Sequence, residues 1–249
     1  MQPCEYAMMH RYEDHYWWYA GLRRLLTLSF KKTSRPTSKV ALLDAGCGTG
    51  ANLVLFKEIL NPEKLFAFDL HSSALRLTSS RNTGALLLQA SVGHIPFQND
   101  QLDIITCLDV LYIRGVSDIE ALREFYRTLK PGGILLINLP AYEFLRGEHD
   151  VAVHTRHRYT AGELSQKLKF VGFKIKRITY WNMFLFPLFF LWRKIRARKK
   201  TPEDPKSDLR PLPSWLNEFL KMVLRIEEIF ITSLNLPFGT SVFAVARKN

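Results

Sequence analysis

The sequence has few cysteines and no long hydrophobic run. Its three cysteines, Cys4, Cys47 and Cys107, do not have the spacing of a metal site or a redox pair. The longest hydrophobic run, residues 183–192, contains Pro187 and is shorter than the roughly 18 to 20 residues of a membrane-spanning helix. These shortages exclude a disulfide-stabilised miniprotein and a conventional transmembrane helix, and they favour a reducing compartment.

Acidic residues are also scarce relative to basic ones. Lys and Arg number 35 against 23 Asp and Glu, which gives a net charge of +12 at pH 7. This excess favours an anionic partner, and nucleic acid, anionic lipid and a phosphorylated substrate all fit it. The N-terminus lacks the basic start and apolar stretch of a secretory signal, so we expect a cytoplasmic protein.

The remaining composition is that of a folded protein, with 47% hydrophobic and 23% charged residues. Short apolar runs that read as buried strands alternate with helical patterns and turn signals from residue 39 onward. The predicted strands are residues 40–43, 65–68, 86–88, 104–108 and 134–139, followed by 173–178 and 241–246. This alternation predicts an α/β fold with a doubly wound, mostly parallel sheet, an N-terminal helix and an elaborated helical C-terminal third.

The chain divides into three segments of one domain. Residues 1–38 are predicted to form a helical cover, and residues 39–180 an α/β core. Residues 181–249 are predicted to hold a helical insertion, with a hydrophobic and basic segment, before the final strand.

The most informative segment is LLDAGCGTG, which ends at Gly50 between a predicted strand and a predicted helix. Its alternating glycines, Gly46, Gly48 and Gly50, let the main chain pass directly against a ligand, whereas an ordinary turn needs only one glycine. Asp69 ends the next predicted strand, where a carboxylate binds the ribose in mononucleotide-binding folds. Together these features predict an adenosine-containing cofactor.

The spacing of the glycines decides which cofactor is favoured. The dinucleotide fingerprint is G-x-G-x-x-G, whereas this turn is G-x-G-x-G with Asp44 two residues ahead, which disfavours NAD. LLDAGCGTG resembles motif I of the class I S-adenosylmethionine-dependent methyltransferases, and FAFDL, LDIITCLDVLYI and LREFYRTLKPGGILLINLP resemble the segments that follow it in that family. The flanking HYWWYAGLRRLL, HTRHRYTAGEL and LPFGTSVFAVARK are similar to a bacterial branch labelled type 11 methyltransferases.

The resemblance implies S-adenosylmethionine as cofactor and a set of residues that bind it. One residue departs from the family pattern, because Ser91 in SVGHIPF stands where an acidic residue is usual. The predicted cofactor-binding residues are Asp44, Gly46, Cys47, Gly48, Gly50, Asp69, Leu70, Ser91 and Leu108, with Trp17 and Arg23 from the N-terminal helix.

Residues 141–160 follow the fifth predicted strand at the sheet edge where the acceptor should bind. If the acceptor is a hydroxyl, a base must remove its proton, and we predict His149 and His154 as catalytic candidates. A solvated polar loop is the alternative, and His149 with a nearby glutamate could instead hold a divalent ion, although we predict no metal. The predicted substrate-binding residues are Tyr112, Arg156, His157 and Tyr159.

The C-terminal third combines an apolar segment with a basic one. Aromatic and leucine side chains at residues 181–192 precede RKIRARKK, which begins at Arg193 and ends at Lys200. This pattern is typical of contact with an anionic membrane surface, and the alternative is a packed helix with a solvated basic tip. RNA is disfavoured, since the fourth strand ends in LDVLY rather than the Asn/Asp-Pro-Pro-aromatic sequence of base amino methylases.

These features predict an S-adenosylmethionine-dependent methyltransferase that methylates a hydroxyl on a small-molecule, lipid-linked or glycan-linked acceptor. The expected location is the cytoplasm, with peripheral contact at the inner membrane face. C-methylation, N-methylation and RNA methylation stay open as alternatives. So do a nicotinamide-dependent oxidoreductase and a protein that binds the cofactor without catalysis.

Overall fold

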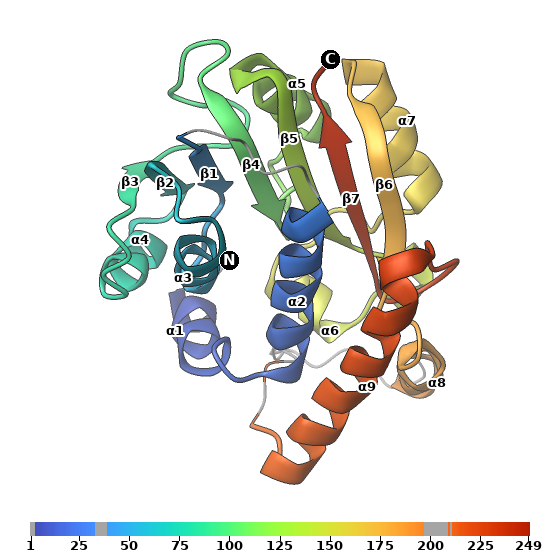
Figure 1. Ribbon diagram of the computed structural model, residues 1–249. Helices are drawn as coiled ribbons and strands as arrows, with labels where there is room; N and C mark the ends of the chain where they lie inside the picture. The colour runs from blue at the N-terminus through green and yellow to red at the C-terminus, as the bar shows by residue number, and fades with distance from the viewer. Residues whose placement is uncertain (1–2, 33–38, 197–208, 210) are drawn as a thin grey trace.

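The computed structural model describes residues 3–32, 39–196, 209 and 211–249, which form a seven-stranded sheet flanked by helices (Figure 1). The strand order is β3-β2-β1-β4-β5-β7-β6. The strands are β1 (Ala41–Ala45), β2 (Lys64–Asp69), β3 (Leu86–Gln89), β4 (Leu102–Leu108), β5 (Leu129–Pro140), β6 (Lys174–Trp181) and β7 (Ser241–Arg247). Strands β1 to β5 are parallel, and β7 is antiparallel to both β5 and β6. The predicted doubly wound, mostly parallel fold is confirmed.

The helices lie on both faces of this sheet and beyond the carboxyl ends of its parallel strands (Figure 1). They are α1 (Pro3–Tyr12), α2 (Trp17–Lys32), α3 (Ala51–Leu60), α4 (Ser72–Ser79), α5 (Asp118–Thr128), α6 (Glu148–Ala152), α7 (Ala161–Val171), α8 (Phe186–Arg196) and α9 (Ser214–Ser233), with a 3-10 helix η1 (Glu143–Leu145). Among the described helices, none is both long and apolar enough to cross a membrane.

The sheet forms because its central strands are apolar on both faces. All five residues of β1 are buried, as is typical of a strand that is covered on both sides by helices. Leu43 and Ile105 face one core with α5 and α7, whereas Leu42 and Ile104 face the other with α2 and α3. Alternation along each strand therefore divides the hydrophobic core into two layers.

One local expectation differs from the structure. The single N-terminal helix predicted from the sequence is two helices, because the helix is interrupted between Tyr12 and Trp17, where the Glu13 side chain turns inward and is buried. The run containing Pro187 forms the first turns of α8, where proline is tolerated because the first N–H groups of a helix have no partner within it.

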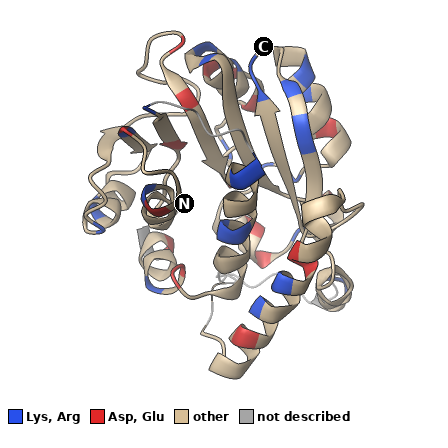
Figure 2. Ribbon diagram, viewed as in Figure 1, with Lys and Arg blue, Asp and Glu red and all other residues tan. Residues whose placement is uncertain are grey.

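Strand β7 and helix α9 join the C-terminal third to the sheet. The buried Glu227 of α9 accepts hydrogen bonds from the main-chain N–H groups of Asn182, Met183 and Phe184, which fixes α9 on the turn after β6. Lys and Arg side chains lie on α2, β6 and α9 in the view of Figure 2, so the positive charge is spread over several elements. The division of the chain into segments at residues 38 and 180 stays a prediction.

Gly239 tests the packing of this C-terminal third. A Cβ at Gly239 would lie 2.2 Å from the Trp181 carbonyl oxygen, whereas a Cβ at Gly162 would have nothing nearer than 4.0 Å. We expect Gly239→Ala to lower the free energy of unfolding by about 1 to 3 kcal/mol, because main chain must move. Gly162→Ala is the control and should be neutral or stabilising by up to about 1 kcal/mol. Denaturant unfolding measures both, and equal stability of the two variants would contradict this packing.

Candidate functional site

The turn between β1 and α3 consists of bare main chain. Gly46, Gly48 and Gly50 have φ angles of 81°, 57° and 82°, in the left-handed region that favours glycine. A Cβ at Gly46 would lie 2.4 Å from a methyl group of Val110, so the turn has no room for a side chain there. The N–H groups of Gly46 and Cys47 both donate to the Phe68 carbonyl at 2.9 Å, which joins this turn to the end of β2.

Asp69 lies beside this turn at the end of β2. Its carboxylate accepts hydrogen bonds from the N–H groups of Gly48 at 3.1 Å and His71 at 3.0 Å. The Tyr6 hydroxyl of α1 donates to the same carboxylate at 3.2 Å, and desolvation by burial raises the pKa of that hydroxyl. Two main-chain donors therefore hold Asp69, and its third donor belongs to a helix that covers the site.

Asp44 is a buried carboxylate with one unpartnered oxygen. Its Oδ1 accepts a hydrogen bond from the Thr106 hydroxyl at 2.6 Å, whereas Oδ2 has no partner among the described residues. Burial raises the pKa of Asp44 to about 7, against the opposing effect of the Thr106 hydrogen bond. Because buried polar atoms are nearly always satisfied, this orphaned oxygen favours a ligand that brings a donor or a positive charge.

The N-terminal helices are fixed over the glycine turn. The Glu13 carboxylate accepts hydrogen bonds from the Thr49 hydroxyl and, at 2.6 Å, from the Arg81 guanidinium, which also donates to the Thr49 carbonyl at 2.7 Å. Arg23 donates to the Glu13 carbonyl at 2.7 Å, so it fixes the α1–α2 turn and does not line the cavity. Trp17 does line it, and its ring stacks on Phe189 of α8 at 5.9 Å.

A cavity of about 910 Å³ extends from the glycine turn, beneath α1 and α2, to α6 and α8. It brings together most of the residues predicted from the sequence. Those that line it are Trp17, Gly46, Cys47, Gly48, Asp69, Leu70, Ser91, Leu108, Tyr112, His149 and His154. Asp44 and Gly50 do not line it. The first is buried beneath the turn, and the second packs against Thr78.

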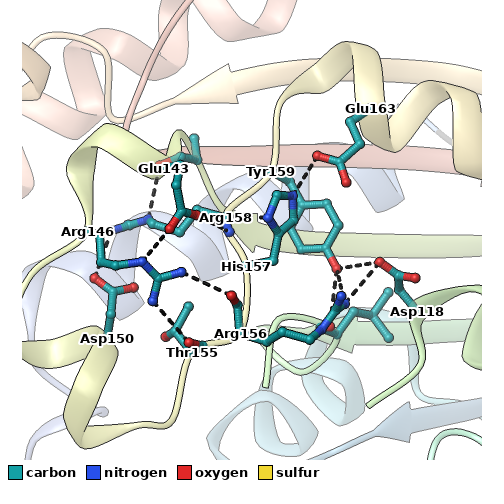
Figure 3. A network of polar contacts seen from close by, with 12 residues as sticks. Asp118, Glu143, Arg146, Asp150, Thr155, Arg156, His157, Arg158, Tyr159 and Glu163 are labelled. Atoms are coloured by element: carbon teal, nitrogen blue, oxygen red, sulfur yellow. Dashed lines mark hydrogen bonds and ion pairs between the residues drawn. The ribbon is translucent and has the colours of Figure 1, made fainter. Parts of the chain in front are cut away.

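Three of the predicted substrate-binding residues lie outside the cavity lining. Figure 3 shows them in a network of polar contacts. The Tyr159 hydroxyl donates to Asp118 at 2.8 Å, Arg156 pairs with the same carboxylate at 3.2 Å, and His157 contacts Glu163 at 2.8 Å. These contacts connect the segment after β5 to helices α5 and α7. The three side chains therefore contact neighbouring helices and do not face the cavity.

Asp109 lines the cavity beside Leu108, in the segment LDIITCLDVLYI that resembles the family's, although it was not among the predicted site residues. It follows β4 with a φ of 60°, and its carboxylate accepts a hydrogen bond from the Asn138 amide at 2.8 Å. The Asn138 amide oxygen accepts from the Trp181 indole at 2.8 Å, which fixes which end of the amide faces Asp109. Burial raises the pKa of Asp109 to about 7, and Asn138 and Arg158 oppose that rise. An acidic residue directly after a buried strand is the signal that had identified Asp69.

Arg158, which like Arg156 could hold an anionic group of the substrate, lines the cavity, whereas Arg156 and His157 do not. Its guanidinium donates to the Leu145 carbonyl at 2.8 Å and to Asp150 of α6 at 3.1 Å. No feature of the sequence distinguishes it from its neighbours. Among the described residues, no group of three or more His, Cys, Asp or Glu side chains is placed to hold a metal ion.

Comparison with known proteins links the central part of the chain to methyltransferases. Residues 43–137 match the model of a methyltransferase domain family. The chain is 35% identical over 98 residues to the malonyl-[acyl-carrier protein] O-methyltransferase of Yersinia pestis, covering 39% of this chain and 35% of that protein. It is 33% identical over 129 residues to the ubiquinone/menaquinone biosynthesis C-methyltransferase of Shewanella frigidimarina, covering 47% of this chain and 50% of that protein.

The matched regions are thus half or less of the length of these two relatives. A structure of Haemonchus contortus phosphoethanolamine N-methyltransferase 2 in complex with S-adenosyl-L-methionine has a TM-score of 0.57 to this chain at 17% identity. The superposition covers 90% of this chain and 52% of the Haemonchus contortus chain. At 17% identity the similarity shows that the two proteins share a fold.

The two raised carboxyl pKa values predict how stability depends on pH. A folded-state pKa of about 7 means that the folded protein binds protons more tightly than the unfolded chain between about pH 4 and 7. These groups therefore lower the free energy of unfolding as pH rises through that window. Asp44→Asn and Asp109→Asn should each make the fall of the unfolding free energy with pH less steep, by at most about 1.4 kcal/mol per pH unit. Denaturant unfolding at several pH values tests this, and an unchanged pH slope in both variants would contradict it.

Proposed function

We propose that this chain, whose core is a class I S-adenosylmethionine-dependent methyltransferase domain, transfers a methyl group to a hydroxyl of a small-molecule, lipid-linked or glycan-linked acceptor. One observation supports this most strongly: a single cavity has a bare glycine turn and Asp69 at one end and two histidines at the other. This arrangement supplies a cofactor end and an acceptor end within one enclosed space.

The residues at the cofactor end fit S-adenosylmethionine. Gly46 and Gly48 line the cavity with main chain alone, and Asp69 can accept hydrogen bonds from ribose hydroxyls. The unpartnered oxygen of Asp44, beneath the turn, suits the positively charged amino group of the methionine part through water. The chemistry supplied there by the cofactor is an electrophilic methyl group on a sulfonium.

The acceptor end offers three candidate bases. His149 and His154 line the cavity, and Asp109 lies between them and the glycine turn at the end of β4. A base in this position takes the proton from the acceptor hydroxyl as its oxygen forms the bond to carbon. The presence of several bases favours an acceptor that must lose a proton, which supports a hydroxyl over an activated carbon.

The cavity wall favours an acceptor with an apolar part. Trp17, Phe189 and Trp192 line it together with Leu212 and Leu220, so this part of the wall is apolar. An apolar enclosure suits a small amphiphile or a lipid-linked group better than an RNA backbone, which needs an open basic groove.

The membrane contact predicted at Arg193 to Lys200 is part of this proposal. Residues 197–200 lie outside the described part of the chain. An acceptor held by a lipid would be reached most directly by a protein bound peripherally at the inner membrane face.

Cofactor binding gives the first test of this function. We expect Asp69→Asn to weaken binding of S-adenosylhomocysteine by about 1 to 3 kcal/mol, because the ribose hydroxyls lose a charged acceptor. Isothermal titration calorimetry measures this change. Asp100→Asn is the control, since Asp100 is exposed before β4 and far from the carboxyl ends of the strands. An unchanged affinity in Asp69→Asn would remove this residue from the site.

The acceptor class requires a transfer experiment. Cell extract incubated with the protein and methyl-labelled S-adenosylmethionine should show label in lipid, glycan or small-molecule fractions. His149→Ala, His154→Ala and Asp109→Asn should identify the base by a loss of about a hundredfold or more in transfer, with S-adenosylhomocysteine affinity unchanged. Label found only in RNA, or equal transfer by all three variants, would contradict the proposed hydroxyl chemistry.

A further inference from the structure

Helices α8 and α9 each have two apolar faces on opposite sides. The inward face of α8 places Phe189 and Trp192 in the cavity wall, and the inward face of α9 buries Leu224 and Ile231. A second row of apolar residues recurs at three- and four-residue steps on the outer side of each helix. This outer row, which we name the α8–α9 apolar face, consists of Phe184, Leu188, Leu191 and Ile195 at α8 and Trp215, Phe219, Met222, Ile226 and Ile229 on α9.

The side chains of this face are exposed. Leu188 is 63% exposed, Trp215 71% and Ile229 68%. The segment that leads into α8 touches α9 where the Phe184 ring contacts Phe230 with 5.7 Å between ring centres, and Figure 1 places the two helices at the same end of the molecule. Many exposed apolar residues on two neighbouring helices of a folded protein mark a binding surface, because water alone is a poor partner for them.

Positive charge lies at the edge of this apolar face. Helix α8 contains no acidic residue, and the exposed Lys194 lies next to Ile195 of this face. The sequence continues the basic character to Lys200. On α9 both signs of charge occur (Figure 2), and Glu218 pairs with Lys221 at 2.7 Å, so α9 adds little net charge. The combination is apolar in the middle and cationic at one edge.

We propose that the α8–α9 apolar face binds the surface of an anionic phospholipid bilayer, with both helices lying in the interface. Apolar side chains enter the region between headgroups and acyl chains, and the basic edge is attracted to anionic headgroups. The charge argues against a second copy of the chain, because two copies paired through this face would bring their exposed Lys194 side chains together.

This inference rests on the proposed function and makes it more specific. The inner sides of the same two helices, with the segment that precedes α9, line the cavity through Phe189, Trp192, Leu212 and Leu220. Arg193 lies against Gly147, where an added Cβ would overlap its guanidinium, so α8 also packs on the segment that leads into α6. Membrane docking therefore places the acceptor end of the cavity next to the bilayer, where a lipid-linked acceptor is found.

Vesicle cosedimentation of the full chain tests the proposal without a known acceptor. We expect binding to phosphatidylcholine vesicles that contain about a third phosphatidylglycerol, and much weaker binding to pure phosphatidylcholine. Binding to the anionic vesicles should weaken when salt rises from about 0.1 M to about 0.5 M, because counterions screen the basic edge.

Matched variants separate this face from general stickiness. Leu188→Glu and Ile226→Glu should each weaken vesicle binding more than about tenfold, and Lys194→Gln about fivefold. Leu86→Glu is the control, because Leu86 is 61% exposed on the edge strand β3, away from α8 and α9, and should bind vesicles like the unaltered chain. Circular dichroism checks that each variant is folded.

Three outcomes would overturn the proposal. The first is no sedimentation of the unaltered chain with anionic vesicles at low salt, and the second is an equal loss of vesicle binding in Leu86→Glu and Leu188→Glu. The third is a dimer of the unaltered chain that Ile226→Glu dissociates, when neither the dimer nor the variant binds vesicles. The last would assign the face to a second copy. Titration of the variants with S-adenosylhomocysteine keeps this test separate from the methyltransferase proposal, since Leu188→Glu should lose vesicle binding and retain cofactor affinity.

Discussion

The carboxylate of Asp69 holds the glycine turn against the end of β2, and the site is arranged around this contact. Its bond to the Gly48 N–H joins the first two strands of the sheet at their carboxyl ends. The turn can stay this close because Gly46 has no side chain to meet Val110. Main chain thereby forms one wall of the cavity, and the buried Asp44 lies beneath it with one oxygen unsatisfied.

Two further polar connections extend from this centre. On one side, Glu13 and Arg81 fix the N-terminal helices to Thr49, so the cover of the cavity is anchored to the same turn that forms its wall. On the other side, the indole of Trp181 orients Asn138, which in turn holds Asp109. The C-terminal third thus contributes to the site through β6, and through α8 and α9 it presents an apolar surface outward. These connections join the cofactor end, the acceptor end and the outer face in one structure.

Much of the fold could be predicted because buried parallel strands have a simple pattern of short apolar runs between helical periods. The cofactor turn was equally visible, since its glycines and Asp69 are local or at strand ends. The acceptor end was less accessible. The Tyr159 hydroxyl donates a hydrogen bond to Asp118, which is 41 residues away in the sequence. Residues near Tyr159 therefore give no sign that this hydroxyl has a partner within the protein. Arg158 and Arg156 are the same residue type in the same segment, and only the folded backbone decides that Arg158 reaches the cavity. The interruption between α1 and α2 coincides with the buried contacts of Glu13, which involve residues distant in the sequence.

Hydrogen–deuterium exchange with and without S-adenosylhomocysteine locates the ligand on the chain and thereby tests whether the glycine turn and Asp69 hold it. We expect slower amide exchange in residues 46–50, around Asp69 and in α1 when the ligand is present. Exchange unchanged in these segments while the ligand is bound, or protection confined to another part of the molecule, would contradict this expectation.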